Sequence, residues 1–134
     1  MIFDGTVENN APILYFKPGS DYVLSARVSV KFATKWDAGA LMLMGDDHHW
    51  AKLSFEFSPD SKPTLVTRGL SADCNSVSVQ GDSVYLRIAK SGKAHVFYFS
   101  TDGRNWQILR TFRLDRGVIF FRSSLGNKII CLVV

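Results

Sequence analysis

The segment from residue 49 to residue 57 places hydrogen-bonding side chains at alternate positions. Trp50, Lys52, Ser54 and Glu56 share one parity, and the residues between them are mainly apolar. Because successive side chains of a strand point to opposite faces, the segment is predicted to be a strand with one face in a hydrophobic core. The other face would carry an indole, an ammonium, a hydroxyl and a carboxylate in one row, groups that can stack on a sugar and exchange hydrogen bonds with it. The sequence predicts a shallow, open groove here that binds a polar ligand.

Lys52 and Glu56 need partners from elsewhere. Their backbones are about 13 Å apart at ~3.3 Å per residue, so the two side chains are not expected to touch each other. Arg87 is one candidate partner, since it alternates with Leu86 and Ile88. In the ligand-binding interpretation these groups line a concave sheet face; in the alternative they form a cross-strand ion ladder that keeps the sheet soluble and in register. Four side chains from other strands complete the predicted binding set: Thr67, Tyr85, Arg87 and His95.

Two tryptophans and an aspartate lie beside predicted turns. Trp36 and Asp37 lie at a turn over residues 34–37, and Trp50 follows a turn over residues 46–49. The apolar body and polar N–H of tryptophan suit a half-wet site, so both indoles are candidate stacking platforms for a sugar, with Asp37 as a hydrogen-bonding group. The alternative is that they cover the ends of the core. Trp106 follows the Asp102–Gly103 turn and is expected to pack over that hairpin.

The acidic loops raise the question of a metal. Residues 46–49 read Asp-Asp-His-His, but four adjacent residues cannot easily converge on one ion, and no second spaced group of ligands accompanies them. A polar turn is the preferred interpretation. A structural calcium remains an alternative, because loop carboxylates supply suitable oxygens: Asp37, Asp46, Asp47 and Asp102. No metal site and no cofactor is predicted.

Catalysis is not expected. Glycosidases of the common type use a pair of carboxylates, whereas Glu56 is the sole carboxylate in a strand interior on the polar face. The chain has no nucleophile elbow, phosphate-binding loop, zinc-binding helix motif or dinucleotide fingerprint. The sequence therefore indicates a protein that binds rather than reacts.

The elements that must position these residues are strands. Period-two apolar patches recur along all 134 residues, separated by turn residues, and no window shows sustained helical periodicity. One domain, residues 1–134, is expected, built as an all-β sandwich or barrel. The last apolar strand is expected to be paired in a sheet. The predicted strands are 2–7, 12–17, 21–31, 38–44, 49–57, 63–68, 75–79, 83–90, 94–100, 105–112, 117–123 and 127–133.

Charge and cysteine content narrow the partners and the compartment. The net charge of +4 is spread among acidic residues and not gathered in a patch, so nucleic-acid binding is not expected. No stretch approaches the ~20 apolar residues of a membrane span, and the N-terminus lacks the features of a signal peptide. Cys74 and Cys131 form no disulfide framework. Two free thiols favour a reducing compartment, and a cytoplasmic location is expected.

Short motifs follow one another along the chain in a fixed order. They are Asn10-Ala11-Pro12, Asp37-Ala38-Gly39, Trp50-Ala51-Lys52 with Glu56, Val66-Thr67, Tyr85-Leu86-Arg87 and Ser100-Thr101-Asp102-Gly103-Arg104-Asn105-Trp106. This ordered set resembles the DUF1349 family, whose founding eukaryotic member is described as a regulator of enolase. The resemblance covers about residues 10 to 112 and implies a concanavalin A-like jelly-roll β-sandwich of two antiparallel sheets. It also suggests a relationship to lectin-like domains appended to some glycoside hydrolases.

This chain departs from the family pattern in one place that bears on ligands. Family members usually carry Ser-Asp-Trp after the Val-Thr strand, whereas residues 71–76 here contain no tryptophan. The expected function is a non-catalytic, lectin-like domain that binds a carbohydrate or similar polar ligand. The alternative is a protein-interaction or regulatory domain acting on a metabolic enzyme. A glycoside hydrolase is the third, less favoured, possibility.

Overall fold

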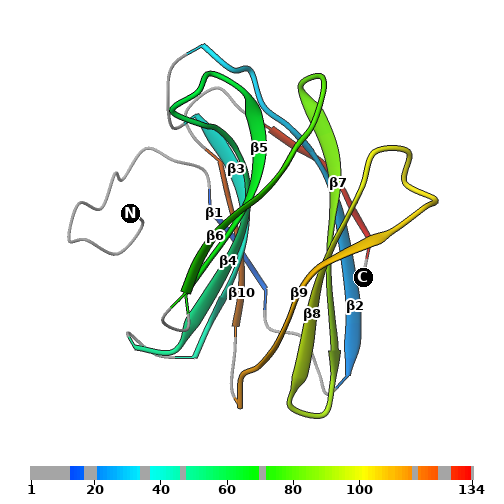
Figure 1. Ribbon diagram of the computed structural model, residues 1–134. Helices are drawn as coiled ribbons and strands as arrows, with labels where there is room; N and C mark the ends of the chain where they lie inside the picture. Colours follow the sequence, from blue (N-terminus) through cyan, green and yellow to red (C-terminus); the bar gives the residue numbers. More distant parts are fainter. Residues whose placement is uncertain are drawn as a thin grey trace.

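In the part of the chain that the structure describes, the regular structure consists of eleven strands, arranged as Figure 1 shows. The computed structural model describes residues 13–16, 21–33, 37–45, 48–69, 72–115, 118–123 and 128–133. The strands are β1 (Ile13–Phe16), β2 (Tyr22–Ser29), β3 (Ala38–Met44), β4 (Trp50–Phe57), β5 (Pro63–Gly69), β6 (Ala72–Ser78), β7 (Ser83–Ser91), β8 (Ala94–Ser100), β9 (Gln107–Arg113), β10 (Val118–Ser123) and β11 (Lys128–Val133). Within these ranges no helix is long and apolar enough to cross a membrane.

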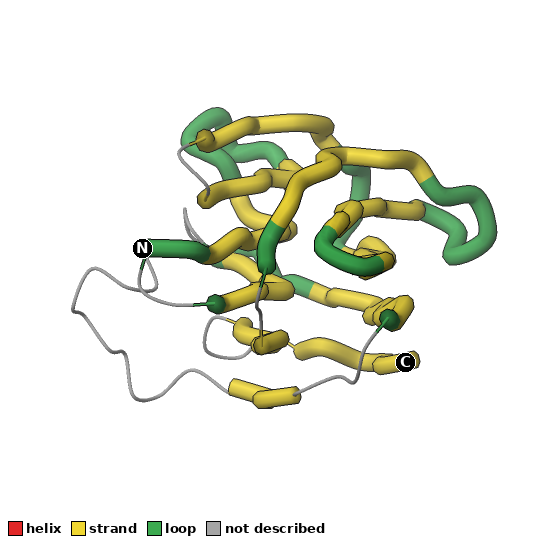
Figure 2. The backbone as a smooth tube through the Cα atoms, turned by 90° about the horizontal axis from the view of Figure 1, so that it is seen from below, coloured by secondary structure: helices red, strands yellow, loops and turns green. Residues whose placement is uncertain are grey.

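The strands form two antiparallel sheets packed face to face. One has six strands in the order β1-β10-β3-β4-β5-β6, and the other has five in the order β11-β2-β7-β8-β9. Figure 2 shows the two layers from a second direction. Neighbouring strands such as β3, β4 and β5 are joined as hairpins, whereas β1, β10 and β11 are inserted from distant parts of the chain. This confirms the predicted all-β jelly-roll sandwich.

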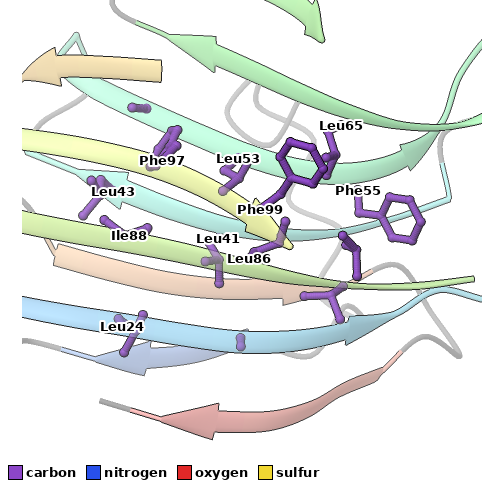
Figure 3. Packing of buried hydrophobic residues seen from close by; sticks show 14 of the residues in the cluster. Leu24, Leu41, Leu43, Leu53, Phe55, Leu65, Leu86, Ile88, Phe97 and Phe99 are labelled. Atoms are coloured by element: carbon purple, nitrogen blue, oxygen red, sulfur yellow. The ribbon is translucent and has the colours of Figure 1, made fainter. Parts of the chain in front are cut away.

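The core lies between the sheets and is built by alternate residues of each strand. Leu41, Leu53 and Phe55 of the six-stranded sheet are fully buried, as are Leu86 and Ile88 of the five-stranded sheet. In Figure 3 their side chains meet between the layers. Because burying a leucine or phenylalanine stabilises the fold by about 1.5–3 kcal/mol, this row of large side chains holds the sheets together and determines which face of each strand is outward.

The predicted strands agree closely with the observed ones. Eleven of the twelve predicted segments coincide with strands β1 to β11, with ends shifted by up to three residues. The segment 2–7 lies outside the described residues. The expected hairpin at Asp102 and Gly103 joins β8 to β9. The last apolar segment is paired as expected, because β11 is hydrogen-bonded to β2.

The β8–β9 turn owes its shape to one carboxylate. Asp102 Oδ1 accepts hydrogen bonds from the backbone N–H groups of Arg104 and Asn105, each at 2.8 Å, and from the Ser100 hydroxyl at 2.9 Å. These donors favour the charged form and hold the pKa of Asp102 well below its usual range. Gly103 has φ +76°, a conformation that glycine adopts without strain.

Candidate functional site

The outer face of the six-stranded sheet carries three rows of side chains across β3, β4 and β5. We call this surface the Glu56 face. The residues of this face alternate along each strand with core residues such as Leu41 and Leu53, as the sequence predicted. The rows, read across the three strands, are Met42, Lys52 and Arg68; Ala40, Ser54 and Val66; and Ala38, Glu56 and Thr64.

Glu56 lies within an ion-pair cluster on this face. Its Oε2 accepts a hydrogen bond from the Ser54 hydroxyl at 2.9 Å and lies 3.9 Å from Lys52 Nζ. Its Oε1 lies 3.8 Å from Arg68 Nη2. The expectation that Lys52 and Glu56 are too far apart to interact is wrong, because their long side chains lean toward each other along the strand. An ion ladder therefore exists, but its cross-strand partner is Arg68 and not Arg87.

The cluster is buried. Relative exposure is 5% for Glu56, 9% for Lys52 and 0% for Ser54. The other strand neighbours in these rows are buried too, namely Met42, Ala40, Val66 and Thr64, so the expected shallow, open groove is wrong. Arg68 keeps 28% of its side chain exposed, and Trp50 is partly buried. Solvent thus reaches this row of the Glu56 face at Arg68, a position that we call the Arg68 corner.

Thr67 and His95 face the interior and not this surface. Thr67 is paired with the core residue Leu53 and is 2% exposed. His95 is 1% exposed; its ring stacks on Phe112 with centroids 5.3 Å apart, and its Nδ1 lies 3.3 Å from the carbonyl oxygen of Lys93. Burial lowers the pKa of His95 below its ordinary value. The prediction that these two side chains line the same sheet face as Glu56 is therefore wrong.

Tyr85 and Arg87 lie on the outer face of the other sheet. Their neighbours in β7 alternate into the core, so both side chains point away from the six-stranded sheet. Arg87 Cζ lies 3.7 Å from the centroid of the Trp106 ring, and its Nε donates a hydrogen bond to the Ser25 hydroxyl at 2.7 Å. Gly103 packs against the Tyr85 ring so closely that an added Cβ would lie 3.1 Å from it. Arg87 therefore cannot act as a partner of Lys52 or Glu56, and the prediction that it does is wrong.

The structure was compared with the predictions for the residues beside turns, which are Trp36, Asp37 and Trp50. Trp36 lies outside the described residues. Asp37 Oδ2 accepts a hydrogen bond from the backbone N–H of Ala33 at 2.9 Å, and its carbonyl oxygen accepts one from Phe57 N–H at 3.0 Å. Asp37 therefore closes the loop that leads into β3, at the Glu56 end of the face. By strand alternation Trp50 shares the Glu56 face, beyond Lys52.

Sequence reasoning missed Arg68, which is the exposed member of the cluster. Residues 63–69 mix polar and apolar side chains on both parities, so alternation alone did not show which of Thr67 and Arg68 faces outward. The pairing of Lys52 with Arg68 shows that Arg68 faces outward, on the same side as Lys52. This pairing places two cations directly opposite each other, an arrangement that is unfavourable unless an anion lies between them. Glu56 supplies that anion.

The residues that the structure describes do not support the metal hypothesis. No group of three or more histidine, cysteine, aspartate or glutamate side chains is placed to hold an ion among the described residues. Asp46 and Asp47 lie outside that set. The Asp102 carboxylate is occupied by the donors of its own turn.

The arrangement of strands and the two outer faces define a concanavalin A-like jelly-roll sandwich. Three solved structures illustrate the likeness. A functionally unknown protein from Saccharomyces cerevisiae matches with a TM-score of 0.62 and 19% identity over 90% of this chain and 74% of that one. CG-16, a homodimeric agglutinin from chicken liver, matches with a TM-score of 0.55 and 10% identity over 92% and 98%.

The third similar structure belongs to a larger enzyme. The GH43 protein BlXynB from Bacillus licheniformis matches with a TM-score of 0.63 and 8% identity over 87% of this chain, but the match spans 30% of that enzyme. At such identities the likeness shows the fold alone. No curated protein matches the chain. The chain belongs to the DUF1349 family, described as protein of unknown function, because the family model matches residues 2–121.

Proposed function

We propose that the chain is a non-catalytic, lectin-like domain that binds a carbohydrate at the Arg68 corner of the Glu56 face. The observation that carries the proposal is the side chain of Arg68, which is 28% exposed and whose buried Nε atom has no hydrogen-bond partner within the protein. Buried donors are almost always paired, because an unpaired one costs about 1–3 kcal/mol. A hydroxyl or ring oxygen of a sugar would accept hydrogen bonds from the exposed part of this side chain, because the buried Nε atom itself lies out of a ligand's reach. The likeness of the fold to a protein described as an agglutinin supports the same ligand class.

The buried and the accessible residues would have different roles. Arg68 would donate hydrogen bonds to the ligand, and Trp50 would offer its ring for stacking. Glu56, Lys52 and Ser54 are too buried for broad contact with a sugar, so they would hold Arg68 in place through the Glu56 carboxylate. This division differs from the sequence interpretation, in which Lys52 and Glu56 touched the ligand directly.

The environment of Glu56 argues against hydrolysis. Among the described residues, the groups that contact its carboxylate are one hydroxyl and two cations. A glycosidase of the common type needs a second carboxyl group about 5–10 Å away, one of the two acting as a proton donor. Glu56 is instead committed to ion pairs, so we infer that it has no catalytic role.

A glycan array tests the proposal, because the two outer faces each carry a tryptophan. Binding should be lost in Trp50→Ala and kept in Trp106→Ala, which alters the opposite face and serves as the matched control. No binding to any glycan would overturn the proposal. Loss of binding in Trp106→Ala with retention in Trp50→Ala would overturn its location.

Chromogenic glycosides test the absence of catalysis. No turnover is expected from the purified chain. Turnover that disappears in Glu56→Gln would show that the site is catalytic.

A second function is favoured by a different surface. On the outer face of the five-stranded sheet, Ile108 is 64% exposed and Val23 is 49% exposed. Apolar side chains on an outer sheet face are available for contact with a partner, and the sheet order places β7 and β8 between these two. The alternative is therefore a protein-interaction or regulatory domain that acts on a metabolic enzyme. An enzyme captured from lysate by the wild type and lost by Ile108→Asp would support it, whereas capture unaffected by that substitution would count against it.

We also infer that the chain works in a reducing compartment, as a cytoplasmic protein does. Cys74 belongs to β6 of the six-stranded sheet and Cys131 to β11 of the five-stranded sheet, and each strand is the outermost in the order of its sheet. Titration with a thiol reagent in denaturant, without reductant, should find two free thiols. Finding none would contradict the inference.

A further inference from the structure

We propose that the outer face of the five-stranded sheet binds a polypeptide segment that carries both acidic and aliphatic side chains. We call this surface the Arg87 face. Its central row crosses β2, β7, β8 and β9 at Ser25, Arg87, Tyr98 and Ile108. The inference goes beyond the carbohydrate proposal, because it concerns the opposite sheet and does not depend on any glycan being bound.

The strands of this sheet carry cations and no carboxylate. Neither aspartate nor glutamate occurs in β11, β2, β7, β8 or β9, whereas lysine or arginine occurs in all of them except β8. The acidic residues lie instead in the connecting turns, where Asp21 pairs with Lys90 at 3.8 Å and Asp115 pairs with Arg113 at 3.4 Å. Charges that are scattered along the sequence are thus gathered by the order of the strands.

Arg87 is held in place but keeps donors for a ligand. Its Nε donates a hydrogen bond to the Ser25 hydroxyl at 2.7 Å, and its Cζ lies 3.7 Å from the centroid of the Trp106 ring. Neither Nη atom hydrogen-bonds to a described residue, and neither is a buried atom without a partner, so both reach solvent. A guanidinium fixed in this way can bind a carboxylate through its Nη atoms with little further loss of side-chain entropy.

Arg27 adds a second cation on the neighbouring strand. It faces the same way as Arg87 and lies one diagonal step from it in the β2–β7 ladder, which corresponds to about 7–8 Å between the two backbones. Among the described residues its polar contact is the neutral Ser83 hydroxyl, 3.5 Å from Nη2. An anionic partner on this face would be attracted by both guanidinium groups.

A third cation comes from the β8–β9 turn. Arg104 is exposed and follows Gly103, where an added Cβ would lie 3.1 Å from the ring of Tyr85, an outward residue of β7. Asp102 of the same turn contributes one negative charge, because its lowered pKa keeps it ionised. The described part of the Arg87 face therefore carries more positive than negative charge, and its field favours an acidic partner.

Ile108 distinguishes a polypeptide from other polyanions. It ends the central row and is 64% exposed. Two strand spacings separate it from Arg87, about 10 Å in a sheet. Nucleic acids and sulfated polysaccharides carry charge but no aliphatic side chains, so they would leave Ile108 in water. A polypeptide can place a carboxylate on Arg87 and an aliphatic side chain against Ile108 at the same time.

Short random peptides displayed on phage test the inference without assuming a partner sequence. Selection on the purified wild type, after depletion on Arg87→Gln, should enrich peptides that contain aspartate or glutamate together with leucine, isoleucine or valine. No enrichment, or enriched peptides without acidic residues, would overturn the inference. Circular dichroism shows whether each variant is folded.

Isothermal titration with an enriched peptide then separates the two kinds of contact. Replacing its carboxylates by amides leaves the protein unchanged and should weaken binding about tenfold, as expected for the loss of charge-assisted hydrogen bonds. Arg87→Gln should weaken binding of the acidic peptide equally and make the protein indifferent to the amide replacement. Ile108→Ala should weaken binding about fivefold, because apolar contact is lost. Full affinity in either variant would contradict the docking mode.

Lys62→Gln is the matched control for charge. Lys62 is exposed in the β4–β5 turn of the other sheet, so its loss should leave the affinity for the peptide intact. An equal loss in Lys62→Gln and Arg87→Gln would indicate non-specific attraction and overturn the inference. Tighter binding of single-stranded RNA or heparin than of the peptide, unaffected by Ile108→Ala, would assign the face to another polyanion and also overturn it.

The outcomes separate this inference from the carbohydrate proposal. Trp50→Ala, which should abolish glycan binding, should leave the peptide affinity unchanged. An empty glycan array together with an acidic peptide that depends on Arg87 would overturn the first proposal and support the second.

Discussion

The guanidinium carbon of Arg87 lies 3.7 Å from the centroid of the Trp106 ring, on the outer face of the five-stranded sheet. Trp106 comes from the segment between β8 and β9, and Arg87 comes from the middle of β7. The hydrogen bond from Arg87 Nε to the Ser25 hydroxyl holds the guanidinium in place. A cation over an aromatic face is attracted by the ring quadrupole, so this contact fastens the β8–β9 turn to the sheet.

Replacing the indole should weaken that attachment. Trp106→Ala is expected to lower the free energy of unfolding by about 2 kcal/mol, the sum of lost apolar contact and lost cation–π attraction. Urea denaturation followed by circular dichroism measures it. Ile108→Ala is the control, because that side chain is 64% exposed. Its expected effect is within about 0.5 kcal/mol, and a similar loss in both variants would contradict the role given to Trp106.

Removing the central carboxylate of the buried cluster should be costly. Glu56→Gln removes the carboxylate that lies within 4 Å of both Lys52 Nζ and Arg68 Nη2, and the free energy of unfolding should fall by about 1–3 kcal/mol. The lower part of this range reflects the long ion-pair distances of 3.8 and 3.9 Å. Asp115→Asn is the exposed counterpart, since Asp115 lies near Lys93 and Arg113 at the surface. Little change is expected there, and an unchanged stability in Glu56→Gln would show that Glu56 does not stabilise the cluster.

Two glycines with similar backbone angles should respond differently to alanine. Gly69 has φ +103° and Gly81 has φ +96°, so alanine is strained at both positions. At Gly69 an added Cβ would also meet the carbonyl oxygen of Trp50, whereas at Gly81 nothing lies within 4 Å. Chemical denaturation should show a loss of about 1 kcal/mol for Gly81→Ala and at least about 3 kcal/mol for Gly69→Ala. Equal losses would mean that the Gly69 backbone moves away at no cost.

Burial of His95 should make the fold sensitive to mild acid. Its pKa is lowered in the folded state by burial, the hydrogen bond to the Lys93 carbonyl acts in the opposite direction, and the nearby Lys90 charge lowers the pKa further. The unfolded chain has a histidine pKa of about 6.5 and therefore binds more protons as the pH falls below that value. The contribution is fully present above about pH 6.5 and is lost as the pH falls from there through the folded-state pKa.

Denaturation of the wild type and of His95→Phe between pH 5 and pH 7.5 checks this prediction. His95→Phe keeps an aromatic ring against Phe112 but cannot titrate, so its stability should fall less steeply below pH 6.5. Lys90→Gln should reduce the slope of the wild type in part, because it removes a like charge. Parallel pH profiles for the wild type and His95→Phe would contradict the assignment. The carboxylates with lowered pKa values, Asp102 and Asp115, titrate at lower pH and lie outside this window.

The alternation of side chains and the turn residues were enough to predict an all-β sandwich or barrel and the faces of single strands, whereas the jelly-roll fold was predicted from the family resemblance. The row of Trp50, Lys52 and Glu56 is read directly from the sequence, because a strand turns each successive side chain to the opposite face. The core leucines and phenylalanines follow by the same rule. The β8–β9 hairpin was also predictable, since Asp102 and Gly103 supply the hydrogen bonds and the backbone freedom of a turn.

The tertiary structure decided which faces meet, and here the predicted site had to be revised. Local alternation does not say to which sheet a strand belongs, so Arg87 was grouped with Glu56 although the two lie on opposite outer faces. It does not set the register either, and the register brings Arg68 beside Lys52. Burial of the cluster depends on the packing of distant segments. These relationships arise from contacts between residues far apart in the chain, which no local pattern encodes.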